Sequence, residues 1–188
     1  MSPTYKNAES HLRNINSTWS KIVNTVGPCT LHPHPERQPY EGLIRAITSQ
    51  KLSAAATEAI EIVQTDVESL HSCGFSKLKA DAVHNIANAA LNKDLPSNDE
   101  INKMSKEDLL EALSKHKSVK RWTIEMYMIF TLGRLDVMPA DDATLRSQIT
   151  HIFHLEGKPS IEELEKVTSP TAPYQTIAAW YLWHYPKH

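Results

Sequence analysis

The chain is short of glycine, cysteine and long hydrophobic runs. Its 188 residues include only 5 Gly and 2 Cys, and the tight-hairpin dipeptides Asn-Gly and Asp-Gly do not occur. Cys29 and Cys73 are too few for a disulfide framework and lack the CxxC spacing of a metal site, so we expect two reduced thiols. Without a run of about 18 apolar residues or a secretory hydrophobic region, we expect an intracellular protein with no membrane association.

The overall charge also excludes some classes of protein. A formal net charge of −2 and a pI near 6.5 exclude a generally polycationic protein, but they leave room for a local phosphate-binding patch. An apolar content of 40% is ample for a buried core and argues against disorder. We therefore expect a folded domain whose positive charge, where it matters, is concentrated locally.

Helical periodicity runs through most of the chain. Apolar residues recur at helical spacing between Leu12 and Val26, and Gly27-Pro28 ends that stripe. Strand-like alternation is almost absent, so we predict an all-α fold of about eight to ten short helices. Helix starts are expected at Ser76, Ser105 and Ser160, and irregular loops at 28–40, 92–104 and 133–142. The predicted inner face of the helix after Ser76 holds Leu78, Ala82, Val83, Ile86 and Ala90.

Positive charge is concentrated between Leu113 and Met126, a stretch with the sequence LSKHKSVKRWTIEM. It ends one predicted helix and begins another at Trp122. Two helices joined by a tight turn there would point backbone N–H groups and the positive end of a helix dipole at one place, which suits a phosphate. The alternative is a solvated basic loop that contributes only solubility, and this stretch alone does not decide between the two. The formal charges of the turn are Lys115, Lys117, Lys120 and Arg121.

Two adjacent carboxylates, Asp141 and Asp142, follow an extended apolar segment and precede a predicted helix. One of them can be the N-cap of that helix, which leaves the other to be explained. His32 and His34 lie two residues apart on a proline-rich loop with no companion carboxylate or cysteine, so we expect no metal site there.

The order of these elements resembles the helix-hairpin-helix DNA glycosylase superfamily, specifically its alkylpurine (3-methyladenine) branch. The resemblance implies two small helical lobes flanking a cleft for a DNA lesion, within a single glycosylase-type domain over residues 1–188 whose hairpin lies at about 107–132. The four-cysteine iron–sulfur loop of other branches has no counterpart here, so no cofactor is expected beyond an alkali cation that the hairpin could bind. The likeness is carried by LIRAITSQKLSAAATEAI (43–60), GFSKLKADAVHNIANAAL (74–91), SVKRWTIEMYMIFTLGRLDVMPADDATLR (118–146) and PYQTIAAWYLW (173–183).

The resemblance also implies partners and site residues. It implies lesion-containing double-stranded DNA as the partner of a monomer, located in the nucleus if the source is eukaryotic. Asp142 corresponds to the carboxylate that stabilises an oxocarbenium-like sugar as the base leaves. Trp122 stands where relatives with lyase activity carry a Schiff-base lysine, so no lyase activity is expected. The other implied residues are Ser118, Val119, Lys120, Arg121 and Thr123 for phosphate binding, Gln50, Lys51 and Leu52 for the intercalating wedge, and Trp122, Met126 and Asp141 for the lesion pocket.

The chain departs from the family pattern at three places. Ser118-Val119-Lys120 replaces Gly-h-Gly, in which h is aliphatic, and a Lys forced into a left-handed conformation there would cost roughly 1 kcal/mol. Thr171 and Gln175 stand where active relatives carry Trp and Arg. Lys51 replaces the more common Leu or Gln of the wedge, and its stem can fill a gap while its ammonium reaches a phosphate or a base edge.

Two functions follow. The departures favour recognition of damaged DNA (abasic or alkylated sites) by nucleotide flipping in base excision repair, with excision weak or lost and Asp142 a vestige. The alternative, supported by Asp142 and the intact scaffold, is an active monofunctional alkylpurine DNA glycosylase that hydrolyses the N-glycosidic bond of 3-methyladenine-type bases. A third hypothesis, an interaction module that no longer binds DNA, fits poorly with the basic hairpin.

Overall fold

The computed structural model describes residues 3–48, 75–117, 119–157 and 159–186. Every regular element in these ranges is a helix, which confirms the all-α prediction. Among these helices none is both long and apolar enough to cross a bilayer. The predicted wedge (Gln50, Lys51 and Leu52), Cys73 and Ser118 lie outside the described residues.

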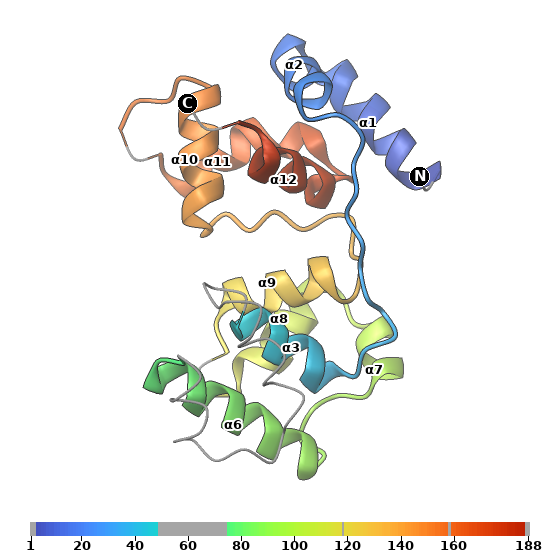
Figure 1. The fold of residues 1–188 in the computed structure, drawn as a ribbon, viewed down its shortest axis with the longest axis vertical. Coiled ribbons are helices and arrows are strands. Elements are labelled where there is room, and N and C mark those ends of the chain that lie inside the picture. The colour runs from blue at the N-terminus through green and yellow to red at the C-terminus, as the bar shows by residue number, and fades with distance from the viewer. Residues whose placement is uncertain (1–2, 49–74, 118, 158, 187–188) are drawn as a thin grey trace. The chain divides into compact units, whose positions relative to one another are not determined.

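The chain folds into two compact units, one made of residues 1–33 and 133–188 and the other of residues 34–132 (Figure 1). The first unit, blue and orange to red in Figure 1, contains α1 (Pro3–Ile15), α2 (Ser17–Val26), α10 (Ala143–Ile152), α11 (Ile161–Thr168), the 3₁₀ turn η2 (Ser169–Thr171) and α12 (Gln175–His184). The second unit contains α3 (Pro39–Thr48), α6 (Lys77–Leu91), α7 (Asn98–Lys103), α8 (Lys106–Ser114) and α9 (Arg121–Phe130).

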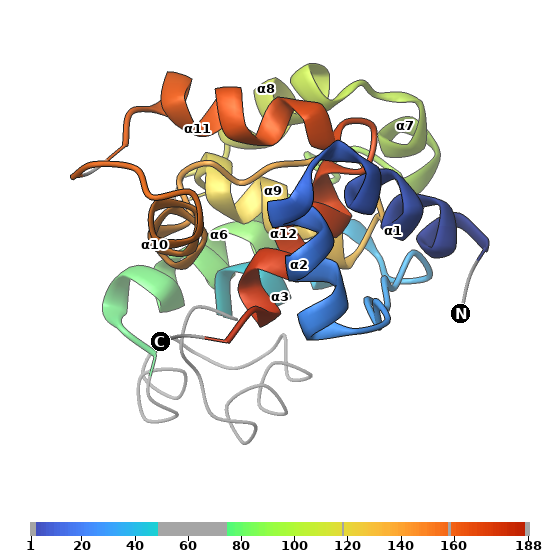
Figure 2. The ribbon, with the colours of Figure 1, turned by 90° about the horizontal axis from the view of Figure 1, so that it is seen from above.

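Helix α12 is the centre of the first unit. Seven of its ten residues are buried, in an unbroken run from Thr176 to Leu182. A helix that is apolar around its whole circumference must be enclosed by other elements. Accordingly, α12 contacts α1, α2, α10 and η2, and α1 and α2 lie side by side in both views (Figures 1 and 2). This packing fixes where the end of α12 lies against α10.

Helix α9 is the buried central helix of the second unit. It buries seven of its ten residues, from Thr123 to Ile129, and packs against α3 and α8. Side chains of Tyr127 and Thr131 lie close against the backbone of α3 at Gly42. A Cβ atom on Gly42 would lie 2.5 Å from Cε2 of Tyr127 and 2.7 Å from Oγ1 of Thr131, so only glycine fits between these helices.

Two predicted segments differ from the structure. The apolar stripe from Leu12 to Val26 is not one helix, because the chain is extended at Asn16, whose side chain accepts the N–H of Trp19 at 3.0 Å and caps α2. The predicted irregular segment 92–104 contains helix α7, which begins with a capping box formed by Ser97 and Glu100. In both places a short polar cap starts a helix at a point that apolar periodicity does not mark.

The other helix starts are confirmed, but two residues of the predicted inner face of α6 are not buried: Ala90 is half-buried, with Ala89 buried in its place, and Leu78 is exposed. Ser105 and Ser160 each form a capping box, and Ser76 is an N-cap although its side chain makes no cap hydrogen bond. Leu78 was predicted to face inward, yet 74% of it is exposed. It lies in the first turn of α6, one helical turn before the buried Ala82.

We expect Gly42→Ala to lower the free energy of unfolding by about 2 kcal/mol, because the added methyl group would collide with a buried ring. Urea denaturation of the purified chain measures this change. The control is a double-mutant cycle with Tyr127→Leu: if the collision is the cause, the combined loss will be smaller than the sum of the single losses. Additive losses would contradict the close contact.

Candidate functional site

The predicted hairpin is formed by α8 and α9 and the turn between them. Within the turn, the N–H of His116 donates to the carbonyl of Leu113 at 3.2 Å, and the N–H of Val119 donates to the carbonyl of His116 at 3.1 Å. Val119 is buried, with 3% of it exposed, and anchors the turn in the core of the second unit. The four cationic residues around it, Lys115, Lys117, Lys120 and Arg121, are all exposed, so the turn presents positive charge to solvent.

Lys120, at the second glycine position of the family pattern, is not strained. Its φ of −98° and ψ of 161° lie in the extended region, and it is the N-cap of α9 without a side-chain cap hydrogen bond. The roughly 1 kcal/mol cost expected of a left-handed lysine does not arise. A residue entering a helix is ordinarily extended at the N-cap, so this position tolerates a side chain.

Arg121 is tied to the body of its own helix. Its Nε–H donates to Oε1 of Glu125 at 2.9 Å, and Glu125 is completely buried whereas 57% of the Arg121 side chain is exposed. The guanidinium therefore offsets a buried carboxylate. Lys115 also has an acidic partner, because its Nζ lies 3.7 Å from Oε1 of Glu111, so Lys117 and Lys120 supply the larger share of the outward charge of the turn. The sequence contains the pair of Arg121 and Glu125 at i, i+4 spacing, but the prediction assigned Arg121 to phosphate alone.

The other hairpin and pocket residues lie on different faces of α9. Trp122 is half-buried, whereas Thr123 and Met126 are buried, with 5% and 4% of each exposed. Thr123 and Met126 thus contribute to packing in the second unit, and Trp122 is the one of the three that shows more of its side chain.

Asp142 belongs to the first unit, where it is the N-cap of α10. Its Oδ1 accepts the backbone N–H of Leu145 at 2.7 Å and also the indole Nε1–H of Trp183 at 3.0 Å. The half-buried carboxylate is thereby held by its own helix and by α12. The expectation that one of the paired aspartates caps this helix is confirmed for Asp142.

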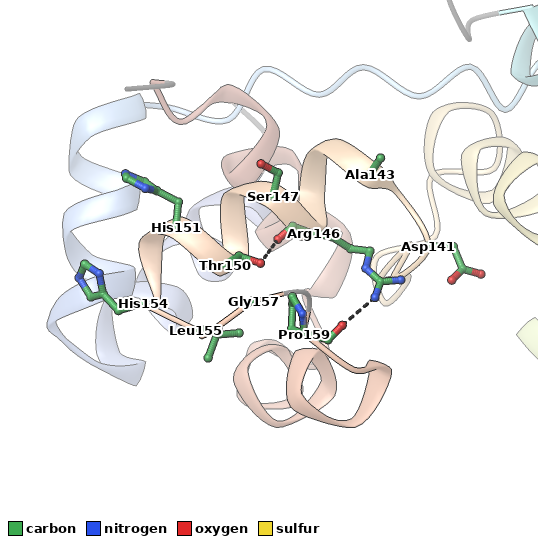
Figure 3. A pocket seen from close by; sticks show the side chains of 10 residues that line it. All are labelled: Asp141, Ala143, Arg146, Ser147, Thr150, His151, His154, Leu155, Gly157 and Pro159. Carbon is green, nitrogen blue, oxygen red and sulfur yellow. Dashed lines mark hydrogen bonds between the residues drawn. The ribbon is translucent and has the colours of Figure 1, made fainter.

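Asp141 lines a cavity of about 760 Å³ formed by α10 and the loop that follows it (Figure 3). The Arg146 side chain leaves α10 there, and its Nη2–H donates to the carbonyl of Pro159 at 2.7 Å, which ties the helix to the following loop. Asp142 does not line this cavity, and Trp122 and Met126 belong to the other unit. The lining residues are Asp141, Ala143, Arg146, Ser147, Thr150, His151, His154, Leu155, Gly157 and Pro159.

Trp183 is the residue that the sequence analysis missed. Aromatic residues of a helix usually pack in the core, and three of its neighbours near the C-terminus, Trp180, Tyr181 and Tyr185, are buried. Trp183 is half-buried and donates to Asp142. An indole N–H commonly finds a hydrogen-bond partner, but which acceptor it meets depends on how α12 packs on α10, which spacing along the chain does not reveal.

Two other reactive side chains have structural roles. Burial raises the pKa of the Cys29 thiol to about 11, so at neutral pH it is protonated and not a nucleophile. His34 Nδ1 lies 3.0 Å from Oε1 of its neighbour Glu36. In the part of the chain that the structure describes, no three His, Cys, Asp or Glu side chains are grouped so that they could hold a metal ion.

Comparison with known proteins identifies the family. The model of the HhH-GPD superfamily of base excision DNA repair proteins matches residues 8–173. The chain belongs to this superfamily. Within it, the chain is 59% identical to the alkylbase DNA glycosidase-like protein mag2 of Schizosaccharomyces pombe, over 97% of this chain and 94% of that protein. It is 37% identical to DNA-3-methyladenine glycosylase 1 of the same organism, over 96% of this chain and 87% of that protein.

Solved structures of HhH-GPD proteins share the fold. The 3-methyladenine DNA glycosylase Mag1 of Schizosaccharomyces pombe, solved in complex with abasic DNA, superposes with a TM-score of 0.84 at 36% identity, covering 96% of this chain and all of that one. A DNA-3-methyladenine glycosidase of Bacillus halodurans gives a TM-score of 0.73 at 26% identity, over 97% of this chain and 88% of that one. These matches confirm the resemblance to the alkylpurine branch and its helix-hairpin-helix glycosylase fold.

We expect Lys120→Ala to weaken binding to duplex DNA. The slope of log affinity against log salt should also become less negative by about 0.9, the value for one phosphate contact. The structure makes Lys120 the cleaner test, because Arg121→Ala would also remove an ion-pair partner from the buried Glu125. The matched control is Lys103→Ala, an exposed lysine at the end of α7, which precedes α8 and so lies at the opposite end of that helix from the turn. Equal slopes for both variants would show that Lys120 does not contact phosphate.

Proposed function

We propose that this protein binds lesion-containing duplex DNA and hydrolyses the N-glycosidic bond of alkylated purines, as a monofunctional glycosylase without lyase activity. The observation that carries the proposal is the Asp142 carboxylate, held by two N–H donors at the start of α10. The similarity to DNA-3-methyladenine glycosylase 1 and to Mag1 favours this activity over the first expectation from the sequence, in which excision was weak or lost.

The chemistry requires a fixed negative charge near the sugar. A purine alkylated as in 3-methyladenine is cationic while attached, so it leaves as a neutral base when it takes the electron pair of the C1′–N9 bond. The positive charge then develops on the sugar, where a preorganised carboxylate stabilises it. The oxygen of a water molecule bonds to C1′, and the water proton passes to the carboxylate or to solvent.

The hairpin supplies binding in this proposal. Lys115, Lys117 and Lys120 are exposed around the buried Val119 and can neutralise phosphates of the DNA backbone. Phosphate contacts position a protein on DNA without selecting sequence, which suits a protein that must find lesions in any context. The abasic DNA bound to Mag1 supports an abasic or flipped-out nucleotide as the recognised state.

Further parts of the proposal concern the whole protein. We propose that residues 1–188 act as one domain and as a monomer, without an iron–sulfur cluster or other cofactor, although the hairpin could bind an alkali cation. Its place of action would be inside the cell, and in the nucleus of a eukaryote. The wedge would be Lys51, flanked by Gln50 and Leu52.

The decisive experiment is base release by the unaltered chain and by Asp142→Asn. We expect release from duplexes with a single 3-methyladenine or 7-methylguanine, slowed by about 100-fold or more in the variant, because the carboxylate acts when the sugar becomes cationic. Asparagine is as good an N-cap as aspartate, so α10 should be preserved. Binding to an abasic duplex should be equal or tighter, because a negative charge facing DNA is removed.

Asp99→Asn is the matched control, since Asp99 is an exposed aspartate in the first turn of α7, in the other unit, and has no assigned role. It should release base at the unaltered rate. If the unaltered chain prefers abasic over undamaged duplex but releases no base, the protein is a lesion recogniser. Neither release nor abasic preference would contradict both functions and support an interaction module.

Lys51→Ala tests the proposed wedge. A side chain that fills the gap beside a flipped nucleotide acts where a gap exists, so we expect the variant to lose affinity for abasic duplex by a larger factor than for undamaged duplex. Equilibrium binding to both duplexes at one salt concentration measures the two factors. Equal factors would mean that Lys51 is another phosphate contact.

A further inference from the structure

The Asp142 carboxylate is held by more than a helix cap. One donor to Oδ1, the N–H of Leu145 at 2.7 Å, belongs to the same helix. The other, Nε1–H of Trp183 at 3.0 Å, comes from α12, more than forty residues later in the chain. Two donors approaching one oxygen from separate elements restrict the carboxylate more than a cap alone does.

This restriction concerns the rotation of the carboxylate. The terminal torsion of aspartate is broad, so a single hydrogen bond leaves the plane of the two oxygens free to turn. A second donor from another helix selects one orientation of that plane. An electrostatic stabiliser acts best when it needs no reorganisation as charge develops, and orientation is what the second bond provides.

Trp183 is itself well anchored. It lies in the last turn of α12, which is buried over most of its length. Just beyond it, the side-chain amide of Gln148 on α10 donates to the carbonyl of Tyr185 at 2.8 Å, in a buried position. Two hydrogen bonds, from Gln148 to Tyr185 and from Trp183 to Asp142, thus join the end of α12 to α10. The bond from Gln148 holds the backbone next to Trp183 in place and so keeps the indole beside Asp142.

The partner of the indole is a charged group. The Trp183 side chain is half-buried, and its Nε1–H donates to a carboxylate. A charged acceptor makes a stronger hydrogen bond than a neutral one, and Asp142 is such an acceptor.

We infer that Trp183 is a positioning residue for base excision: its indole N–H fixes the orientation in which the Asp142 carboxylate stabilises the sugar cation. The inference rests on the proposed function. It adds a residue of α12 to those that act in base excision. This chain keeps that tryptophan, although Thr171 and Gln175 replace the Trp and Arg of active relatives.

Trp183→Phe tests the inference, because it keeps an aromatic ring and removes the N–H. Trp180→Phe is the matched control on the same helix: Trp180 is buried and packs against the rings of Tyr181 and His184. With a duplex containing one 7-methylguanine, we expect the single-turnover rate of Trp183→Phe to fall by about 10- to 100-fold, as for a small misplacement of a catalytic group. Affinity for an abasic duplex should be unchanged, and Trp180→Phe should retain the unaltered rate.

A second measurement does not depend on activity. In ¹⁵N-labelled protein the indole resonance of Trp183 is identified by its loss in Trp183→Phe. We expect it to shift in Asp142→Ala and to stay in place in Asp141→Ala. If none of the four indole resonances shifts in Asp142→Ala, the inference is overturned, and this outcome needs no assignment and so holds even if Trp183→Phe fails to fold.

The outcomes separate the two proposals. If the unaltered chain releases base and Trp183→Phe does so equally fast, the inference is wrong and the proposed function stands. Loss of rate and of abasic binding by the same factor would assign Trp183 a structural role and also overturn the inference. No release by the unaltered chain would overturn the proposed function and the inference together.

Discussion

Burial of one helix on nearly every side is the constraint on which each unit of this protein depends. Helix α12 in the first unit and α9 in the second bury seven of ten residues each, so neither can rotate or slide without exposing apolar surface. Some of the candidate functional residues lie at the ends of these two helices. Trp183 is in the last turn of α12, and Lys120 and Arg121 begin α9. Exposed groups are thereby positioned by packing that occurs elsewhere in the helix.

In the proposed function, the carboxylate of Asp142 has two roles that compete. As an N-cap it stabilises α10, an effect worth about 1 kcal/mol. As a negative charge facing the phosphates of bound DNA, it would lower the affinity for DNA. Capping alone would account for an aspartate at this position. The hydrogen bond from Trp183 is different, because capping α10 does not need it.

Local signals in the sequence predicted much of the fold, and packing determined what they missed. The serines at 105 and 160 mark helix starts because each capping box is contained in four residues. Helix α7 has the same signal at Ser97, but six residues are too few to show apolar periodicity. The contact between Asp142 and Trp183 joins residues far apart in the chain, so no local pattern contains it. The pairing of Arg121 with Glu125 was visible as i, i+4 spacing, yet only the structure shows that Glu125 is buried.

The distribution of the four tryptophans gives the molecule an optical reporter of its own. Trp19 and Trp180 are buried, whereas Trp122 and Trp183 are half-buried and each stands beside a candidate site, one in each unit. A small collisional quencher dissolved in the buffer therefore reaches mainly the second pair. Fluorescence that DNA shields from such a quencher would come from indoles beside the hairpin or beside Asp142, so the unlabelled protein can report which candidate site the DNA covers.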